Sequence, residues 1–219
     1  MSADSLAARL NDLLPQTQCT RCGYPDCAAY AQAMANGEAD INQCPPGGAA
    51  GVERLARLTG RPVQPLNPAH GTEGPLRLAL IDEDWCIGCT LCIKACPTDA
   101  IVGANKRMHT VVEAWCTGCE LCVPVCPVDC IALRVVDPHA SGWSAWSADQ
   151  ATQARVRYAA RQTRVAREQT EHRSRKTAEA QAKLADLASH SKIADPEVLD
   201  RKKAFIEAAL AKARARQGG

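Results

Sequence analysis

The spacing of apolar positions changes along the chain and predicts regions of different structure. In the N-terminal region, apolar side chains recur at helical spacing over residues 3–13 and again over 49–58. Pro25 suits the first turn of another short helix, and Gly37 suits its end. These patterns predict a small helical domain over residues 1–60.

The middle of the chain has short apolar runs in place of helical periodicity. Residues 76–81 and 131–136 are expected to form the first and last strands of a second domain, with a hairpin over residues 101–112. The preceding residues 61–75 are rich in Pro and Gly and are expected to form a linker. We predict an α+β domain over residues 76–137, built from two short hairpins over two helical turns.

From residue 148 the composition shifts to Ala, Arg, Gln and Lys. One long helix is expected over residues 150–189 and a second over 196–216, with Asp195 as the N-cap of the second. The first helix has few apolar positions, so we expect it to cross solvent or to dock weakly. The predicted fold class is therefore α+β, with an all-α extension over residues 148–219.

The middle domain contains an internal duplication. The segment WCIGCTLCIKACPTDAI of residues 85–101 returns as WCTGCELCVPVCPVDCI at residues 115–131. The Trp, Gly, Leu, Pro, Asp and Ile recur in register with all four cysteines. The two repeats are therefore placed at residues 76–105 and 106–136.

Each repeat reads Cys-x2-Cys-x2-Cys-x3-Cys-Pro, which is the spacing of bacterial ferredoxins that hold two [4Fe-4S] clusters. In those ferredoxins the fourth cysteine of each run ligates the other cluster. Gly88 and Gly118 permit the tight loops that place three thiolates around one metal core. Zinc is the competing ligand of any four cysteines. The resemblance assigns one cluster to Cys86, Cys89, Cys92 and Cys126, and another to Cys96, Cys116, Cys119 and Cys122.

A further set of four cysteines precedes the duplication. Cys27 falls at the start of the predicted helix, where the helix dipole favours a thiolate. Four cysteines with one long gap also describe a structural zinc site. Because a two-cluster ferredoxin follows, we favour a third [4Fe-4S] cluster on Cys19, Cys22, Cys27 and Cys44.

The segments LPQTQCTRCGYPDC, residues 14–27, and INQCPPGG, residues 41–48, resemble the iron-sulfur domain of the B subunit of the Rnf-type electron transport complex. The order of this domain and a two-cluster ferredoxin also matches, so the resemblance covers residues 1–137. It implies a protein that passes low-potential electrons from a ferredoxin-type donor to other subunits of a membrane complex. Members of that family usually begin with a transmembrane helix, and we expect this chain to be a soluble form without one.

The cysteine content bears on the cellular compartment. Thirteen cysteines in 219 residues would suit a disulfide scaffold in a secreted protein. The ligand spacing and the lack of a recognisable export signal indicate a reducing compartment instead. The longest strongly apolar run, residues 76–81, is too short to cross a bilayer. We expect a cytoplasmic protein, with peripheral association at the inner face of the cell membrane as an open alternative.

The charge is distributed unevenly. Residues 1–147 carry ten Lys/Arg against fifteen Asp/Glu, whereas residues 148–219 carry sixteen against nine. The run 155–176 has eight basic and two acidic residues. It is expected to be a solvated helix face, although binding to an acidic redox partner, a membrane surface or nucleic acid stays open. The alternative function is an iron-sulfur regulator whose basic tail binds nucleic acid; the shortage of interleaved aromatic residues argues against it.

Several single residues have two interpretations. Cys130 is the cysteine outside the three sets, and we expect it to pack as a small apolar residue instead of acting as a redox thiol. Trp85 and Trp115 are expected to shield the clusters from water. Lys94 and Arg21 lie beside ligands and either tune the potential or are solvated charges. No catalytic residues are expected, and no chemistry is assigned to His70, His109, His139, His172 or His190.

Overall fold

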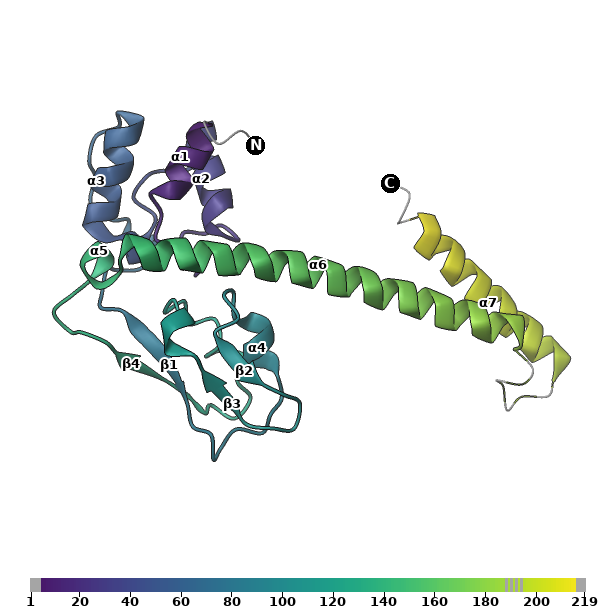
Figure 1. The fold of residues 1–219 in the computed structure, drawn as a ribbon. Coiled ribbons are helices and arrows are strands. Elements are labelled where there is room, and N and C mark those ends of the chain that lie inside the picture. Colours follow the sequence, from purple (N-terminus) through teal and green to yellow (C-terminus); the bar gives the residue numbers. More distant parts are fainter. Residues whose placement is uncertain (1–4, 188, 190, 192, 194, 216–219) are drawn as a thin grey trace. The chain divides into compact units, whose positions relative to one another are not determined.

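The computed structural model describes residues 5–187, 189, 191, 193 and 195–215 (Figure 1). The chain divides into two compact units, Met1–Arg161 and Gln162–Gly219. The division falls within a long helix. The composition predicted that the C-terminal extension starts at residue 148. This residue lies inside the first unit.

Three helices form the N-terminal domain, and all three were predicted. Helix α1 (Leu6–Asp12) is capped by Ser5, whose hydroxyl accepts a hydrogen bond from the Ala8 amide at 3.2 Å. Helix α2 (Cys27–Asn36) is capped by Asp26 and ends at Gly37 in the left-handed conformation. Helix α3 (Gly48–Thr59) follows a 3-10 turn (Pro45–Gly47) and ends at Gly60.

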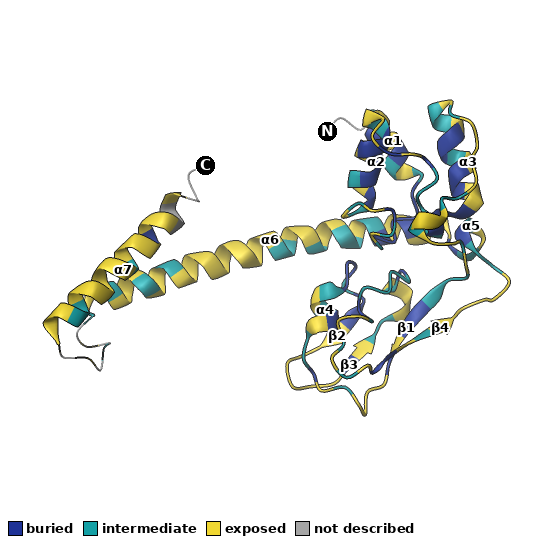
Figure 2. Ribbon diagram, turned by 180° about the vertical axis from the view of Figure 1, so that it is seen from behind, coloured by how far each residue is buried: buried dark blue, intermediate teal, exposed yellow. Residues whose placement is uncertain are grey.

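A small core holds these helices together. Its largest side chains include Leu10, Leu14, Tyr30, Met34 and Leu55, all of which are almost fully buried (Figure 2). The Tyr30 hydroxyl donates a hydrogen bond to the Asp40 carbonyl at 2.6 Å. The buried phenol therefore ties α2 to the loop that leads to Cys44.

The predicted linker lies against the N-terminal domain. Its one regular element is a 3-10 turn (Pro68–His70). The Asn42 side chain donates a hydrogen bond to the Pro65 carbonyl at 2.8 Å. Further along, the Glu73 carboxylate accepts hydrogen bonds from the Ala49 amide at 2.8 Å and from the Ser141 hydroxyl at 2.7 Å. These contacts connect the linker to the N-terminal domain and to Ser141, which follows the second domain.

The second domain has two two-stranded antiparallel sheets. Strand β2 (Ile101–Gly103) pairs with β3 (His109–Val111) in the predicted hairpin. Strand β1 (Arg77–Ile81) pairs with β4 (Ile131–Val135), with Ile81 opposite Ile131. The prediction of two hairpins is wrong on this point, because the β1–β4 pair joins the two ends of the domain.

Of the two repeats, only the first has an α-helical turn around its third cysteine. Helix α4 (Leu91–Ala95) includes a hydrogen bond from the Lys94 amide to the Thr90 carbonyl at 3.2 Å. The equivalent residue in the second repeat is Pro124, which has no amide hydrogen to donate. Residues 121–125 form turns instead, and a 3-10 turn (Glu113–Trp115) precedes that repeat's first cysteine.

Apart from this, the backbones of the two repeats correspond closely. The Asp82 amide donates to the Cys130 carbonyl at 2.8 Å, and thirty residues away the Val112 amide donates to the Ala100 carbonyl at 2.7 Å. Positive φ angles also recur in pairs: Gly88 and Gly118 at 68° and 66°, Thr90 and Glu120 both at 64°, and Asp99 and Asp129 at 51° and 49°. The sequence duplication is therefore a structural duplication.

After β4 the chain returns to the N-terminal domain. Helix α5 (Gly142–Ala145) leads to Trp146, which is buried and donates a hydrogen bond from Nε1 to the Pro15 carbonyl at 2.8 Å. Helix α6 (Ala148–Ala185) begins directly afterwards, and Ala151 and Ala154 in its first turns are buried beside Trp146. The sequence analysis expected this helix to cross solvent or to dock weakly, and it did not identify these residues as the contact.

The second unit contains the remainder of α6 and helix α7 (Pro196–Ala215). The Asp195 carboxylate accepts a hydrogen bond from the Glu197 amide at 2.9 Å, which confirms the predicted N-cap. The expected end of α7 at Arg216 and the residue His190 lie outside the described residues. Most of α7 is exposed (Figure 2). Its exposed residues include Phe205.

Candidate iron-sulfur centres

One cavity in the ferredoxin domain is lined by cysteines of both repeats. Three of these cysteines come from the first repeat, and two come from the second. Ile81 and Ile131 close the cavity from the paired strands β1 and β4. The cysteines that line it are Cys86, Cys89, Cys92, Cys126 and the additional Cys130.

A second cavity has the reciprocal composition. Three of its cysteines come from the second repeat, and one, Cys96, comes from the first. The Cys96 sulfur accepts a hydrogen bond from the Ala100 amide at 3.2 Å. Other residues of the first repeat, including Thr98 and Ile101, also line this cavity. The four cysteines that line this cavity are Cys96, Cys116, Cys119 and Cys122.

The third set of cysteines belongs to the three-helix N-terminal domain. Cys22 and Cys27 are buried in its core, and Cys44 packs against that core. The Cys27 amide donates a hydrogen bond to the Gln18 side chain at 3.0 Å, which fixes the start of α2 against the loop that carries Cys19. Burial, together with the nearby thiols of Cys19 and Cys22, raises the pKa of Cys27 to about 12. The helix dipole predicted to favour its thiolate is therefore outweighed.

Burial also raises the pKa of Cys119 and of Cys122 to about 12, and neighbouring cysteines of the same set add to the effect. A buried thiolate is costly unless a cation lies beside it. Buried sulfur donors that converge on one cavity therefore suit a polynuclear iron core, whose positive charge offsets the thiolates. Among the described residues, no three Cys, His, Asp or Glu side chains are arranged to hold a single metal ion.

Cys126 has a different environment from these cysteines. Burial acts to raise its pKa, but hydrogen bonds from the Val128 and Cys130 amides and from the Cys130 thiol lower the pKa below its ordinary value. The Cys130 sulfur lies 3.5 Å from the Cys126 sulfur and belongs to the buried core. Cys130 therefore packs as expected, while its thiol also contacts a candidate ligand.

His109 was missed by the sequence analysis. It is 1% exposed, and its Nδ1 lies 3.3 Å from the Cys92 sulfur. It occupies the position equivalent to Ala79 of the other repeat, and both residues face the domain core from strands. Its position beside apolar residues in the predicted hairpin 101–112 was the available signal.

The N-terminal set adjoins the loop of the second repeat. The Thr117 hydroxyl, beside Cys116, donates a hydrogen bond to the Thr17 carbonyl at 2.9 Å. In the same loop Glu120 forms ion pairs with Arg21 at 2.7 Å and Arg77 at 2.6 Å. Arg21 therefore has a structural role between two cysteine sets, whereas Lys94 is exposed.

Two family models match the chain at these centres. A 4Fe-4S dicluster domain matches residues 79–133, and a putative Fe-S cluster domain matches residues 14–46. The B subunit of an ion-translocating oxidoreductase complex from Azoarcus sp. (strain BH72) is 61% identical over 143 residues, which cover 65% of this chain and 78% of that protein. The chain belongs to the family of this B subunit.

Other members of the family give the same result. The protein from Thiobacillus denitrificans is 58% identical over 112 residues, 51% of this chain and 60% of that protein. The protein from Pseudomonas paraeruginosa is 57% identical over 143 residues, 65% of this chain and 74% of that protein. The resemblance to the Rnf-type family is confirmed, and with it an iron-sulfur protein of electron transport. Within the described residues we find no helix with the length and apolar character needed to cross a membrane.

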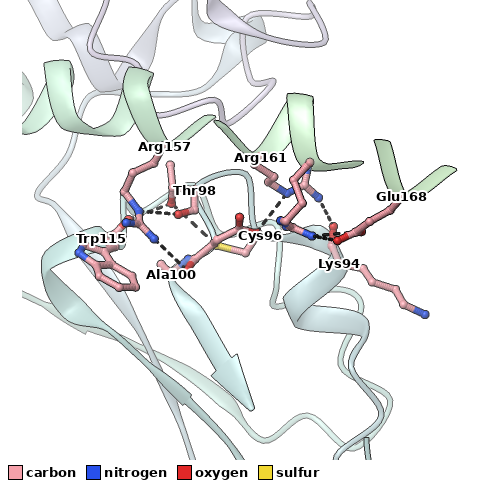
Figure 3. Close-up of polar contacts among 10 residues, drawn as sticks. Lys94, Cys96, Thr98, Ala100, Trp115, Arg157, Arg161 and Glu168 are labelled. Atoms are coloured by element: carbon pink, nitrogen blue, oxygen red, sulfur yellow. Dashed lines mark hydrogen bonds and ion pairs between the residues drawn. The ribbon is translucent and has the colours of Figure 1, made fainter. Parts of the chain in front are cut away.

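Helix α6 lies outside both regions matched by the family models. Two of its arginines nonetheless contact residues beside the second cavity (Figure 3). The Arg157 guanidinium stacks 3.5 Å from the Trp115 ring centroid, and its Nε donates to the Thr98 carbonyl at 2.7 Å. Arg161 pairs with Asp99 and donates to the Lys94 carbonyl. The expectation of a solvated basic face is therefore wrong for these two arginines.

Proposed function

We propose that this protein carries three [4Fe-4S] clusters and passes single, low-potential electrons between a ferredoxin-type donor and the other subunits of an Rnf-type complex. When bound, each cluster accepts or releases one electron. The observation that carries the proposal is the presence of two separate cavities, each lined by three cysteines of one repeat and by the fourth ligand cysteine of the other, with Cys130 as an additional cysteine at the first. The proposed ligand sets are Cys19, Cys22, Cys27 and Cys44; Cys86, Cys89, Cys92 and Cys126; and Cys96, Cys116, Cys119 and Cys122.

The contacts between domains support an order for the electron path. The hydrogen bond from Thr117 to Thr17 and the ion pair between Glu120 and Arg21 both start from the loop that carries Cys116 and Cys119. We call the three ligand sets the Cys19 set, the Cys86 set and the Cys116 set, the last of which includes Cys96. We infer that the Cys19 set exchanges electrons with the Cys116 set. The Cys86 set then forms the other end of the path.

The protein's own residues supply the environment of each centre. The Ala100 amide donates to the Cys96 sulfur, and such bonds stabilise the more negative, reduced state. Trp115 with Arg157 above it reduces access of water to the Cys116 loop. Because the four thiols of each set occupy all the ligand positions of a cube, the sites are suited to electron transfer instead of substrate binding.

Iron and acid-labile sulfide content of anaerobically purified protein tests the number of clusters. About twelve irons are expected for three cubes, and about eight for Cys44→Ser, which removes one ligand of the N-terminal set. Cys130→Ser is the matched control, because it changes a buried cysteine that is outside the sets, and it is expected to keep about twelve irons. About eight irons together with zinc in the unaltered protein would contradict the third cluster.

Redox titration followed by EPR tests the low potential. Potentials of such clusters span about −700 to +450 mV, so the cluster type alone does not determine the value. We expect at least one cluster below the NAD couple, as transfer from a ferredoxin-type donor requires. Every cluster titrating above that couple would exclude this role.

A further inference from the structure

A site on Trp115 of the second repeat is filled by an arginine of the same chain (Figure 3). The site consists of the Trp115 ring and the turn that follows Cys96. Arg157 stacks on the ring at 3.5 Å, and it donates hydrogen bonds to the Thr98 carbonyl at 2.7 Å and the Asp99 carbonyl at 3.3 Å. Trp115 is 37% exposed beneath it.

The equivalent site on Trp85 of the first repeat has no such side chain among its lining residues. By the thirty-residue repeat, Trp85 corresponds to Trp115, Val128 to Thr98 and Asp129 to Asp99. These three residues line an open hollow on the protein surface, together with Leu80 and Ala132. Trp85 is 70% exposed and Leu80 is 52% exposed.

The backbones around the filled and the open site share a turn conformation and a hydrogen bond. Asp99 and Asp129 have φ angles of 51° and 49°, so the turn after each fourth cysteine has the same conformation. The hydrogen bond from Asp82 to Cys130 repeats the one from Val112 to Ala100. The carbonyls of Val128 and Asp129 are therefore the counterparts of the two that accept from Arg157.

The charges around the open site favour a cation. Asp129 and the consecutive residues Asp82, Glu83 and Asp84 are all exposed at or beside the hollow. A guanidinium can stack on an indole and donate to two carbonyls at once, because it is planar and carries five N–H groups. A lysine ammonium is a compact charge and does not reproduce this geometry.

We propose that the open hollow at Trp85, Val128 and Asp129 receives an arginine side chain of the redox partner that exchanges electrons with the Cys86 set. The inference rests on the proposed function, because the hollow adjoins Cys130, whose sulfur contacts the candidate ligand Cys126. The filled site of the second repeat defines how the arginine binds. The partner therefore presents a basic surface with an arginine close to its own redox centre.

Calorimetric titration of cluster-loaded protein with eight-residue peptides of arginine, lysine or citrulline tests the proposal. We expect octa-arginine to bind at least fivefold more tightly than octa-lysine at low salt, and octa-citrulline not to bind. Trp85→Ala should abolish the preference for arginine and leave only the salt-dependent attraction of the acidic residues. Phe205→Ala, which alters another exposed aromatic residue, should change nothing.

Arg157→Ala provides a second test, because it empties the site on Trp115. The number of octa-arginine molecules bound per protein should rise from one to two. Equal affinities for octa-arginine and octa-lysine, unchanged in Trp85→Ala, would overturn the proposal. A dimer of the protein alone that Trp85→Ala dissociates would also overturn it, since the occupant would be a second copy.

Iron content and EPR of the same samples separate this proposal from the proposed function. Protein with its full iron content that shows no preference for arginine would refute the docking site alone. Protein that fails to assemble clusters at all would refute the electron-transfer function. Arg157→Ala with normal iron content would also show that its extra site does not arise from unfolding.

Discussion

The two repeats of the ferredoxin domain carry the same ligand spacing but have different neighbours. Trp115 of the second repeat lies under Arg157 from α6, whereas Trp85 of the first repeat is 70% exposed. The second repeat also contacts the N-terminal domain through Thr117 and Glu120. The second repeat's centre therefore adjoins the N-terminal domain, whereas the first repeat's centre lies beside an open hollow on the surface.

This difference shows how one duplicated unit acquires two roles. The turns, the tight glycine loops and the cross-repeat hydrogen bonds are shared, because cluster binding requires them in both halves. Residues that the ligand geometry leaves unconstrained have diverged: Thr98 corresponds to Val128, and Ala100 to Cys130. The divergence changes what surrounds each centre, which for iron-sulfur clusters helps set the reduction potential and the choice of partner.

The largest expected effect concerns the exchange of ligands between repeats. Cys96→Ser and Cys116→Ser should each remove about four irons, and the double variant should also lose only about four, because both residues serve one cluster. Combining Cys96→Ser with Cys86→Ser should instead remove about eight. Iron analysis and EPR measure both quantities.

The opposite pattern, with Cys96 and Cys86 behaving as one set, would show that each repeat binds its own cluster. Cys130→Ser serves as the control for a buried cysteine outside the sets.

The next effect is a difference in thiol reactivity once iron is removed. Burial raises the pKa of Cys119 and Cys122 to about 12, whereas hydrogen bonds lower that of Cys126. The thiolate is the reactive form, so at pH 8 Cys126 should react with iodoacetamide roughly a thousandfold faster than Cys119. Peptide mass spectrometry over time measures the rates.

The pH dependence supplies a control for this measurement. Since Cys119 stays protonated up to about pH 12, its rate should rise about tenfold for each pH unit from 8 to 10. The rate of Cys126 should level off, because its thiol ionises first. Equal rates at all pH values would mean that the two environments do not differ in the apoprotein.

A smaller effect is expected from removing the arginine that distinguishes the two tryptophan sites. Arg157→Ala should destabilise the protein by about 1–2 kcal/mol through loss of the stacking and hydrogen bonds. It should also lower the potential of the Cys116-set cluster, because a nearby positive charge favours the reduced state. Anaerobic thermal unfolding and redox titration check the two results.

Arg157→Lys should restore the charge and thus part of the potential, but not the stacking geometry. Arg164→Ala, which removes an exposed partner of Glu168 one helical turn away, should cost about 0.5 kcal/mol or less. A shift of the Cys86-set potential as large as that of the Cys116 set would contradict a local role for Arg157.

The smallest effect should come from Cys130→Ala. This change places an alanine at the first centre, as Ala100 is at the equivalent position of the second. Loss of one buried sulfur should cost about 1 kcal/mol or less. Without the thiol beside Cys126, the potential of the Cys86-set cluster should fall slightly. Redox titration should show a smaller change of this potential for Cys130→Ser than for Cys130→Ala, because serine keeps a hydrogen-bond donor. A larger change for Cys130→Ser would argue against hydrogen bonding as the cause.

Much of the fold was predictable because its signals are local. The ends of α2 and α3 at Gly37 and Gly60 and the N-cap at Asp195 follow from the conformations that single residues allow. The strands at residues 77–81 and 131–135 followed from short apolar runs. The pairing of these strands was described wrongly as a hairpin, since an apolar run does not identify its partner. The missing helical turn at residues 121–125 could have been inferred from Pro124.

The sulfur donors of the candidate centres were predictable from the sequence, but the residues that surround them were not. Cysteine spacing, with the neighbouring ferredoxin repeats, pointed to the twelve proposed ligands. Each of the two proposed ferredoxin sets lines one cavity. His109 beside Cys92 was missed, since a single histidine has no spacing to interpret. Arg157 was assigned to a solvated face because its partners lie 42 and 59 residues away in the sequence.

The sequence by itself determined which sulfurs are candidates to bind metal, because ligands two or three residues apart are constrained by the backbone between them. Only the tertiary structure decided which centre adjoins the N-terminal domain and which tryptophan is covered. Those outcomes depend on contacts such as Thr117 with Thr17 and Trp146 with Pro15, across 100 and 131 residues. Contacts over such separations arise from the packing of whole elements, and no local pattern of residues encodes them.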